Sequence, residues 1–154
     1  MPEQELASIM KFIIDNTGNP YPYYHSVPQD FIVPAVYFPS PEIESAGDTL
    51  LSYAFTYTWF VKFFHKDVHL AYNMGLEAIT AIQRRKNLIP IVAENGELID
   101  KHWFRLRDPQ LRAIDNAAQL TLMWNSYRPY DNENAEKAAI FNFNIFLKTI
   151  QGGL

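Results

Sequence analysis

The run from Thr49 to His65 constrains the fold of this chain more than any other segment. Apolar and polar side chains alternate there with a period of two, and β-branched and aromatic residues dominate, which predicts a strand. About fifteen residues at roughly 3.3 Å each would span about 50 Å, so the strand would project beyond its own domain. We therefore expect a second subunit to cover part of its aromatic face, at Tyr53, Phe55, Tyr57 and Trp59.

Two amphipathic helices are predicted on either side of this strand. Apolar residues recur at helical spacing between Glu3 and Asn16, and again after Asp67, which has the side chain of an N-cap. Gly75 lies inside the second helix, where glycine costs about 1 kcal/mol relative to alanine. We expect it there because the helix approaches the sheet closely.

Short strands are predicted near the N-terminus, at Tyr23–Val27 and at Ile32–Phe38, joined by a polar turn. Several prolines fall in this region. Since proline cannot donate to a strand ladder, these strands are expected at a sheet edge. The stretch Ser40–Asp48 is polar, acidic and proline-bearing, and is predicted to be a loop.

After the second helix, Asn95-Gly96 separates two apolar runs, Leu88–Ala93 and Glu97–Leu106, which predicts a β-hairpin. A further reversal near Asp108-Pro109 is expected to lead into a strand at Ala118–Tyr127.

The elements together predict an α+β fold: a single, mostly antiparallel sheet with one very long strand, packed by two helices on one side. Residues 1–154 are expected to form one domain, with residues 131–154 as a peripheral C-terminal segment. The pattern within that segment is compatible with a strand at Ile140–Ile150 or a helix at Glu133–Phe146.

Composition excludes several classes of protein. The chain has 154 residues, of which 48% are hydrophobic, so it is not disordered as a whole. No apolar run reaches the roughly 18 residues of a membrane-spanning helix, and Glu3 and Glu5 stand where a signal peptide carries basic residues. Because there is no cysteine, disulfides, thiolate metal sites and cysteine nucleophiles are excluded.

Charge is distributed unevenly along the chain. The net charge of −4 argues against a general nucleic-acid coat. Residues 1–48 contain seven acids and one base, net −6, whereas residues 84–112 contain seven bases and four acids, net +3. Such polarity suits a subunit that meets copies of itself or a neighbour through unlike faces, with solvated surfaces as the alternative. We expect Arg105, Arg107 and Arg112 to face a protein partner.

No motif for catalysis or cofactor binding emerges. His65 and His69 are four residues apart, but only His69 is firmly helical and no third metal ligand is evident. The sequence also lacks a Gly-x-Ser-x-Gly elbow and a glycine-rich phosphate loop. We expect no catalytic residue, no bound metal and no cofactor.

The order of parts resembles that of the tail terminator, or tail completion, proteins of long-tailed bacteriophages. The resemblance covers roughly residues 3–130. It rests on the N-terminal helix, the edge segment Val27–Phe38, the very long strand, the single helix Asp67–Arg85, the hairpin beginning Leu88-Ile89-Pro90-Ile91, and the closing segment Asp115–Tyr130.

The resemblance implies a structural virion protein rather than an enzyme. Such proteins form a ring, usually of six subunits, that caps the tail tube at its neck-proximal end and docks to the head–tail connector protein. The implied site of assembly is the host cytoplasm, and DNA would pass through the ring without specific binding; no membrane is involved. Two alternatives remain: another connector or stopper subunit, and a small-ligand enzyme or binding protein whose aromatic strand face lines a pocket.

Overall fold

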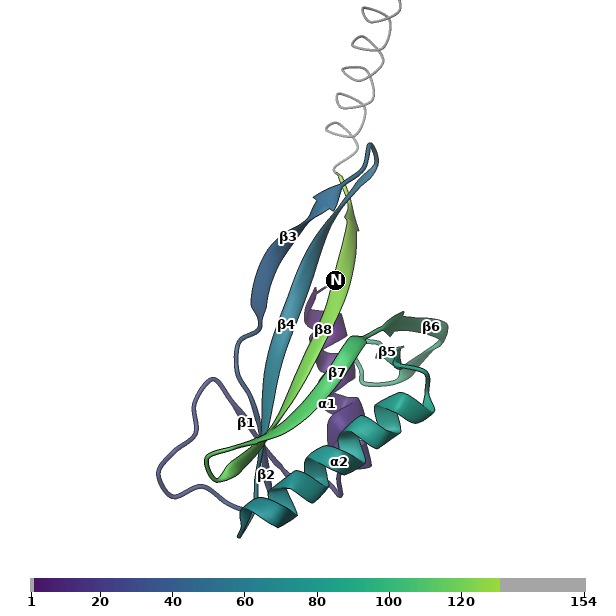
Figure 1. The fold of residues 1–154 in the computed structure, drawn as a ribbon. Coiled ribbons are helices and arrows are strands. Elements are labelled where there is room, and N and C mark those ends of the chain that lie inside the picture. Colours follow the sequence, from purple (N-terminus) through teal and green to yellow (C-terminus); the bar gives the residue numbers. More distant parts are fainter. Residues whose placement is uncertain (1, 131–154) are drawn as a thin grey trace, which may run out of the picture. The chain divides into compact units, whose positions relative to one another are not determined.

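The computed structural model describes residues 2–130, which form two helices and eight strands (Figure 1). In chain order these are α1 (Pro2–Asn16), β1 (Tyr21–Tyr24), β2 (Ala35–Phe38), β3 (Glu42–Asp48), β4 (Ser52–Phe64), α2 (Val68–Arg84), β5 (Leu88–Val92), β6 (Leu98–Arg105), β7 (Arg107–Ile114) and β8 (Ala117–Pro129). Neither helix of this described part is long and apolar enough to span a membrane.

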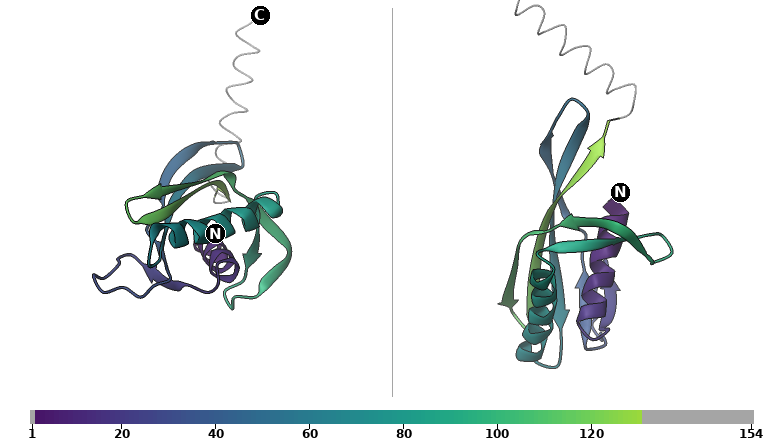
Figure 2. Two further views of the ribbon diagram at one scale, coloured as in Figure 1. Left: turned by 60° about the horizontal axis from the view of Figure 1, so that its bottom comes forward. Right: turned by 90° about the vertical axis from the view of Figure 1, so that its right-hand side faces the viewer.

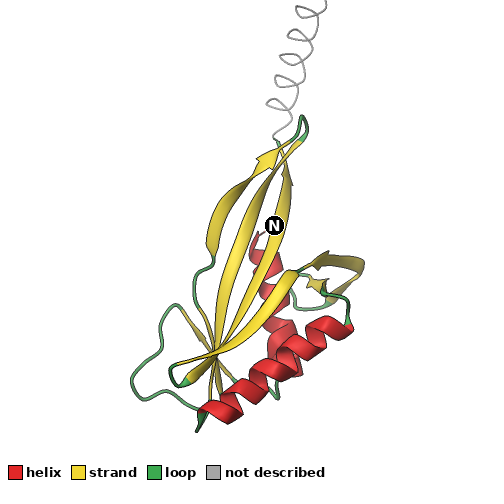
Figure 3. Ribbon diagram, in the orientation of Figure 1, coloured by secondary structure: helices red, strands yellow, loops and turns green. Residues whose placement is uncertain are grey.

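Six of the strands form one sheet in the order β1-β2-β4-β8-β7, with β3 paired to β4 (Figure 3). The pairs β2–β4 and β7–β8 are antiparallel, and β1 runs parallel to β2. Strands β5 and β6 form a separate antiparallel hairpin. This arrangement confirms the predicted α+β class with a mostly antiparallel sheet and a very long strand. It differs from the prediction in two details, because the hairpin forms a second, small sheet and β8 is as long as β4, with 13 residues each.

Both helices pack on the same face of the six-stranded sheet. Gly75 of α2 lies against Leu111 of β7, which is directly opposite Leu120 of β8 and therefore shares its face. Trp124, four residues further along β8, is on that face too and donates from Nε1 to Glu5 Oε2 of α1 at 3.0 Å. The helices also contact each other (Figure 2). The close approach predicted at Gly75 is confirmed.

Local signals in the sequence explain where α2 and the hairpin begin and turn. Asp67 is the N-cap of α2, and its Oδ1 accepts from the Leu70 backbone N–H at 2.9 Å. At the hairpin tip the Gly96 N–H donates to the Ala93 carbonyl at 2.9 Å, and Gly96 has a φ of 81°, where glycine is favoured. Both predictions are confirmed.

The long strand is shorter and less regular than its alternation suggests. β4 has 13 residues, and its alternation of buried and half-buried positions is strict only from Tyr57 to Phe63. Before Tyr57 the pattern shifts, and Ala54 is the buried residue between the half-exposed Tyr53 and Phe55. Among the aromatic residues of β4, Tyr57 and Trp59 are therefore buried, whereas Tyr53 and Phe55, nearer the start of the strand, are half-exposed.

Three sequence predictions for strands need correction. Ser40–Asp48 is not a loop, because Glu42–Asp48 forms β3. All seven residues of β3 are exposed, so the strand has no apolar alternation by which it could be recognised. The predicted strands at Tyr23–Val27 and Ile32–Phe38 are shorter, and they pair in parallel through a connection longer than the predicted polar turn.

The reversal predicted at Asp108-Pro109 lies elsewhere. Those two residues are inside β7, where the register with β8 shifts and Asp108 has a φ of 39°. The chain turns instead at Asp115, whose φ is 51°, and Asn116. Proline is tolerated in β7 because β7 is an edge strand of the sheet. The strand or helix predicted after residue 130 lies outside the described residues.

The chain divides into two compact units. Within the described residues, one unit comprises residues 2–43 and Tyr57–Trp124, and the other comprises Glu44–Thr56 and residues 125–130. Strands β4 and β8 each contribute to both units. The expectation of a single domain stays a prediction.

Candidate interaction surfaces

Tyr57 and Trp59 of the aromatic strand lie in the core of the protomer. Their side chains are 2% and 1% exposed, and the Tyr57 ring stacks on Trp124 with centroids 5.0 Å apart and 11° between planes. Trp59 Nε1 donates to the backbone carbonyl of Pro39. Because the chain itself covers both rings, their burial gives no support to the subunit contact predicted at Tyr57 and Trp59, which stays a prediction.

Tyr53 and Phe55, the other two residues of that prediction, belong to the smaller unit and are half-exposed. Their rings meet edge to face at 5.6 Å. The guanidinium carbon of Arg128 lies 4.9 Å from the centroid of Phe55, and Tyr130 lies 5.5 Å from Tyr53. These rings form a small aromatic and cationic cluster that a partner can reach. The subunit contact predicted at Tyr53 and Phe55 stays a prediction.

The phenol of Tyr130 is held by an acidic neighbour in the same unit. Its hydroxyl donates to Asp48 Oδ2 at 3.0 Å. Partial desolvation and this hydrogen bond raise the pKa of Tyr130 above its ordinary value of 10.0, with the negative charge of Asp48 acting in the same direction. The contact joins the end of β3 to the end of β8.

The three arginines predicted to face a partner are all exposed. Arg105 ends β6, and Arg107 and Arg112 lie on β7. Their register, opposite Met123 and Gln119 of β8, puts Arg107 and Arg112 on the face of the sheet away from both helices. None of the three guanidinium groups forms an ion pair within residues 2–130. They are therefore accessible to an acidic surface, and the contact with a protein partner stays a prediction.

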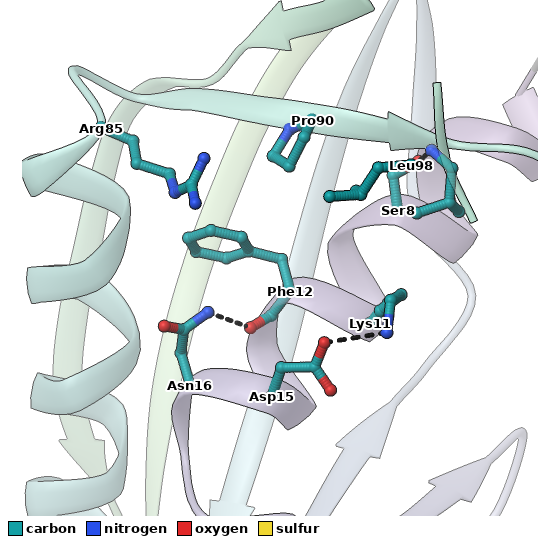
Figure 4. Close-up of a pocket in the computed structure, with 9 residues that line it drawn as sticks. Ser8, Lys11, Phe12, Asp15, Asn16, Arg85, Pro90 and Leu98 are labelled. Carbon is teal, nitrogen blue, oxygen red and sulfur yellow. Dashed lines mark hydrogen bonds and ion pairs between the residues drawn. The ribbon is translucent and has the colours of Figure 1, made fainter. Parts of the chain in front are cut away.

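A hollow of about 220 Å³ lies between α1, the end of α2 and the hairpin (Figure 4). Its charged groups are already engaged, since Lys11 Nζ pairs with Asp15 Oδ2 at 3.0 Å and the Arg85 guanidinium lies 5.7 Å from the centroid of Phe12. The buried Ser8 hydroxyl is also occupied, donating to the Gln4 carbonyl at 2.6 Å and accepting from the Val92 N–H at 3.0 Å. These contacts hold α1 to β5, and they offer no free acid, base or nucleophile to a substrate.

The two histidines considered as metal ligands are not brought together with a third ligand. The ring of His65 accepts at Nδ1 from the Lys66 backbone N–H at 2.8 Å, and His69 is exposed at the start of α2. Among the described residues, no group of three His, Asp or Glu side chains is placed to hold a metal ion.

Sequence reasoning missed one surface, the outer edge of β3. This strand has one hydrogen-bonded neighbour in the described sheet, β4, and carries Glu42, Glu44 and Asp48 but no base. Its alternating acidic residues are the only feature of the sequence that indicates a strand here, and the same residues are equally typical of a solvated loop.

The geometry defines an α+β protein with a long-stranded sheet, two helices on one of its faces, and exposed charged edges. No family model matches the chain. It is, however, 31% identical over 148 residues to the uncharacterized protein YqbJ of Bacillus subtilis, covering 94% of this chain and 99% of YqbJ. It is also 31% identical over 123 residues to the phage-like element PBSX protein XkdJ of the same organism, covering 79% of this chain and 83% of XkdJ.

The chain belongs to the family that contains YqbJ and XkdJ. Since XkdJ is a protein of a phage-like element, this chain is phage-related, and the relation suggests a structural role in a phage particle.

Proposed function

We propose that this chain is a tail terminator, a structural virion protein that assembles into a ring of six subunits on the neck-proximal end of a phage tail tube. The relation to XkdJ, a protein of the phage-like element PBSX, carries the proposal. The order of α1, the edge strands, long β4, single α2, hairpin and closing β8 supports it, because this is the order expected from tail terminators.

In this proposal the ring has two functions, at the tail tube and at the head–tail connector. It binds the last layer of tail tube protein, which stops elongation, and it presents a docking surface to the head–tail connector protein. Both contacts are between proteins, and DNA passes through the channel without specific recognition. The unpaired guanidinium groups of Arg105 and Arg107 are suited to an acidic neighbour in such a stack.

The role is structural and not catalytic. The aromatic face of β4, which a small-ligand protein would need as a pocket wall, is used in the core at Tyr57 and Trp59. The polar groups around the hollow beside α1 hold secondary structure together. The observations therefore favour protein contact over ligand chemistry.

The proposal is tested with purified chain and with tail tubes assembled from the tube protein of the same phage. We expect the chain to co-sediment with tubes and to appear by electron microscopy as a ring at one end only. The Arg105→Glu/Arg107→Glu variant is expected to weaken contact with the neighbouring ring or tube, whereas Arg84→Glu on exposed α2 serves as the matched control. Binding to portal or connector but not to tubes would instead assign the chain as a stopper.

A further inference from the structure

Two of the edge strands of the six-stranded sheet, β3 and β7, carry opposite charge. The edge strand β3 is exposed at all seven residues and contains three acids and no base. The strand β7, at one end of the strand order, pairs with β8 only, and it contains two arginines and one acid. An unpaired strand edge presents backbone N–H and C=O groups that can hydrogen-bond to another strand.

From these edges we infer that β3 of one subunit pairs with β7 of the next, extending the sheet from copy to copy. The inference rests on the proposed function, because a ring requires one repeated contact. It adds which two strands make that contact. It differs from the aromatic interface considered for Tyr53 and Phe55, which involves side chains on a strand that is already paired on both sides.

Charge selects this pairing over the symmetric alternatives. Two β3 edges would place Glu44 of one copy near the acids of the other, and two β7 edges would bring Arg112 groups together. Unlike edges attract instead. A contact between two different patches is head-to-tail, which is the type that closes into a ring, whereas a symmetric contact stops at a dimer.

Backbone irregularities leave a regular stretch of the same length, five residues, in β3 and in β7. In β3, Gly47 has a φ of 99°, so the regular extended part is Glu42 to Ala46, with Glu44 at its centre. In β7, the irregularity at Asp108 and Pro109 leaves Gln110 to Ile114 as the regular part, centred on Arg112. Aligning the two five-residue stretches brings Glu44 opposite Arg112 whichever way the strands run.

A thiol cross-linking experiment tests this contact, because the natural chain contains no cysteine. Ser45→Cys on β3 and Ala113→Cys on β7 are both at exposed positions next to the central pair. Mixing the two single variants with a short bis-maleimide should give cross-linked dimers. Ser45→Cys mixed with Glu77→Cys, on the exposed face of α2, is the matched control and should not.

Charge reversal provides the second measurement. Glu44→Lys or Arg112→Glu alone should raise the concentration needed for half-association by at least about tenfold, and the two changes combined in one chain should restore it. Circular dichroism checks that each variant is folded.

The outcomes separate this inference from the proposed function. If rings form on tubes but the β3–β7 cross-link does not, the edge pairing is overturned and the terminator role is retained. The same conclusion follows if neither charge reversal changes assembly. Cross-linked dimers, charge-swap rescue and no binding to tubes would support the pairing and reject the terminator role. A chain that stays monomeric alone and on tubes would overturn both.

Discussion

A Cβ atom added to Gly75 in α2 would lie 2.4 Å from Cδ1 of Leu111 on β7, well inside van der Waals contact. The backbone conformation of Gly75 is helical, so the reason for glycine there is the neighbouring Leu111 side chain, which an added Cβ would displace, and not its dihedral angles. The contact seats α2 on the sheet at β7.

This contact predicts opposite effects of one substitution in two backgrounds. Gly75→Ala gains about 1 kcal/mol of helix propensity but must displace Leu111, and overpacking costs about 1–3 kcal/mol. We expect a net loss of about 1 kcal/mol in the free energy of unfolding. In a Leu111→Ala background, where the space is open, the same change should stabilise by about 1 kcal/mol. Urea denaturation of the four proteins measures this, and a loss of equal size in both backgrounds would contradict the account.

The aromatic residues of β4 should separate into core and surface positions. Tyr57→Ser removes a ring that is 2% exposed and stacked on Trp124, and is expected to cost about 3–5 kcal/mol of stability. Tyr53→Ser, at a half-exposed position of the same strand, should cost about 1 kcal/mol or less. Chemical denaturation distinguishes the two, and equal losses would show that Tyr57 is not a core residue.

The hydroxyl of Ser8 should be a structural group. Ser8→Ala leaves the buried Val92 N–H without its acceptor, which costs about 1–3 kcal/mol, and it loosens α1 from β5. Hydrogen exchange at Val92 should accelerate accordingly. Ser26→Ala, at an exposed serine, is the control, and an unchanged exchange rate in the Ser8 variant would refute the role.

The phenol of Tyr130 should titrate above its ordinary pKa of 10.0. Because its folded pKa is raised above the ordinary 10.0, its hydrogen bond to Asp48 stabilises the smaller unit fully below pH 10. That stabilisation is lost as the pH rises through the raised pKa. The difference in ultraviolet absorbance between the wild type and Tyr130→Phe isolates this phenol. Asp48→Asn is expected to lower its pKa toward 10.0, and no change would show that Asp48 does not act on it.

The sequence predicted those elements whose signals are local. The stripe of α1, the Asp67 cap and the Asn95-Gly96 turn are determined by neighbouring residues, and each is present in the structure. The close approach of α2 to the sheet at Gly75 could be predicted because a glycine on the apolar face of a helix usually makes room for a neighbouring element.

Two edge strands, β3 and β7, were missed for a physical reason. β3 has both faces in solvent, so nothing selects apolar residues at alternate positions, and its sequence looks like that of a loop. In β7, Asp108 and Pro109 are residue types that are common in turns. In the structure they lie instead at an irregularity inside the strand, where the register with β8 shifts and Asp108 has a positive φ.

The candidate site was predictable only in part. Exposure of Arg105, Arg107 and Arg112 followed from their charge. The burial of Tyr57 and Trp59 did not, because alternation shows that one face is apolar but not whether the same chain or another covers it. Here Trp124 on β8 and Pro39 after β2 complete that cover, and both are far away in the sequence.

The most direct test of the terminator role is the length of tail tubes grown from tube protein with and without the chain. The account predicts that substoichiometric chain stops elongation, shortens the tubes, and remains bound at one end of each. Tubes that grow to the same length, with the chain left in solution, would contradict it.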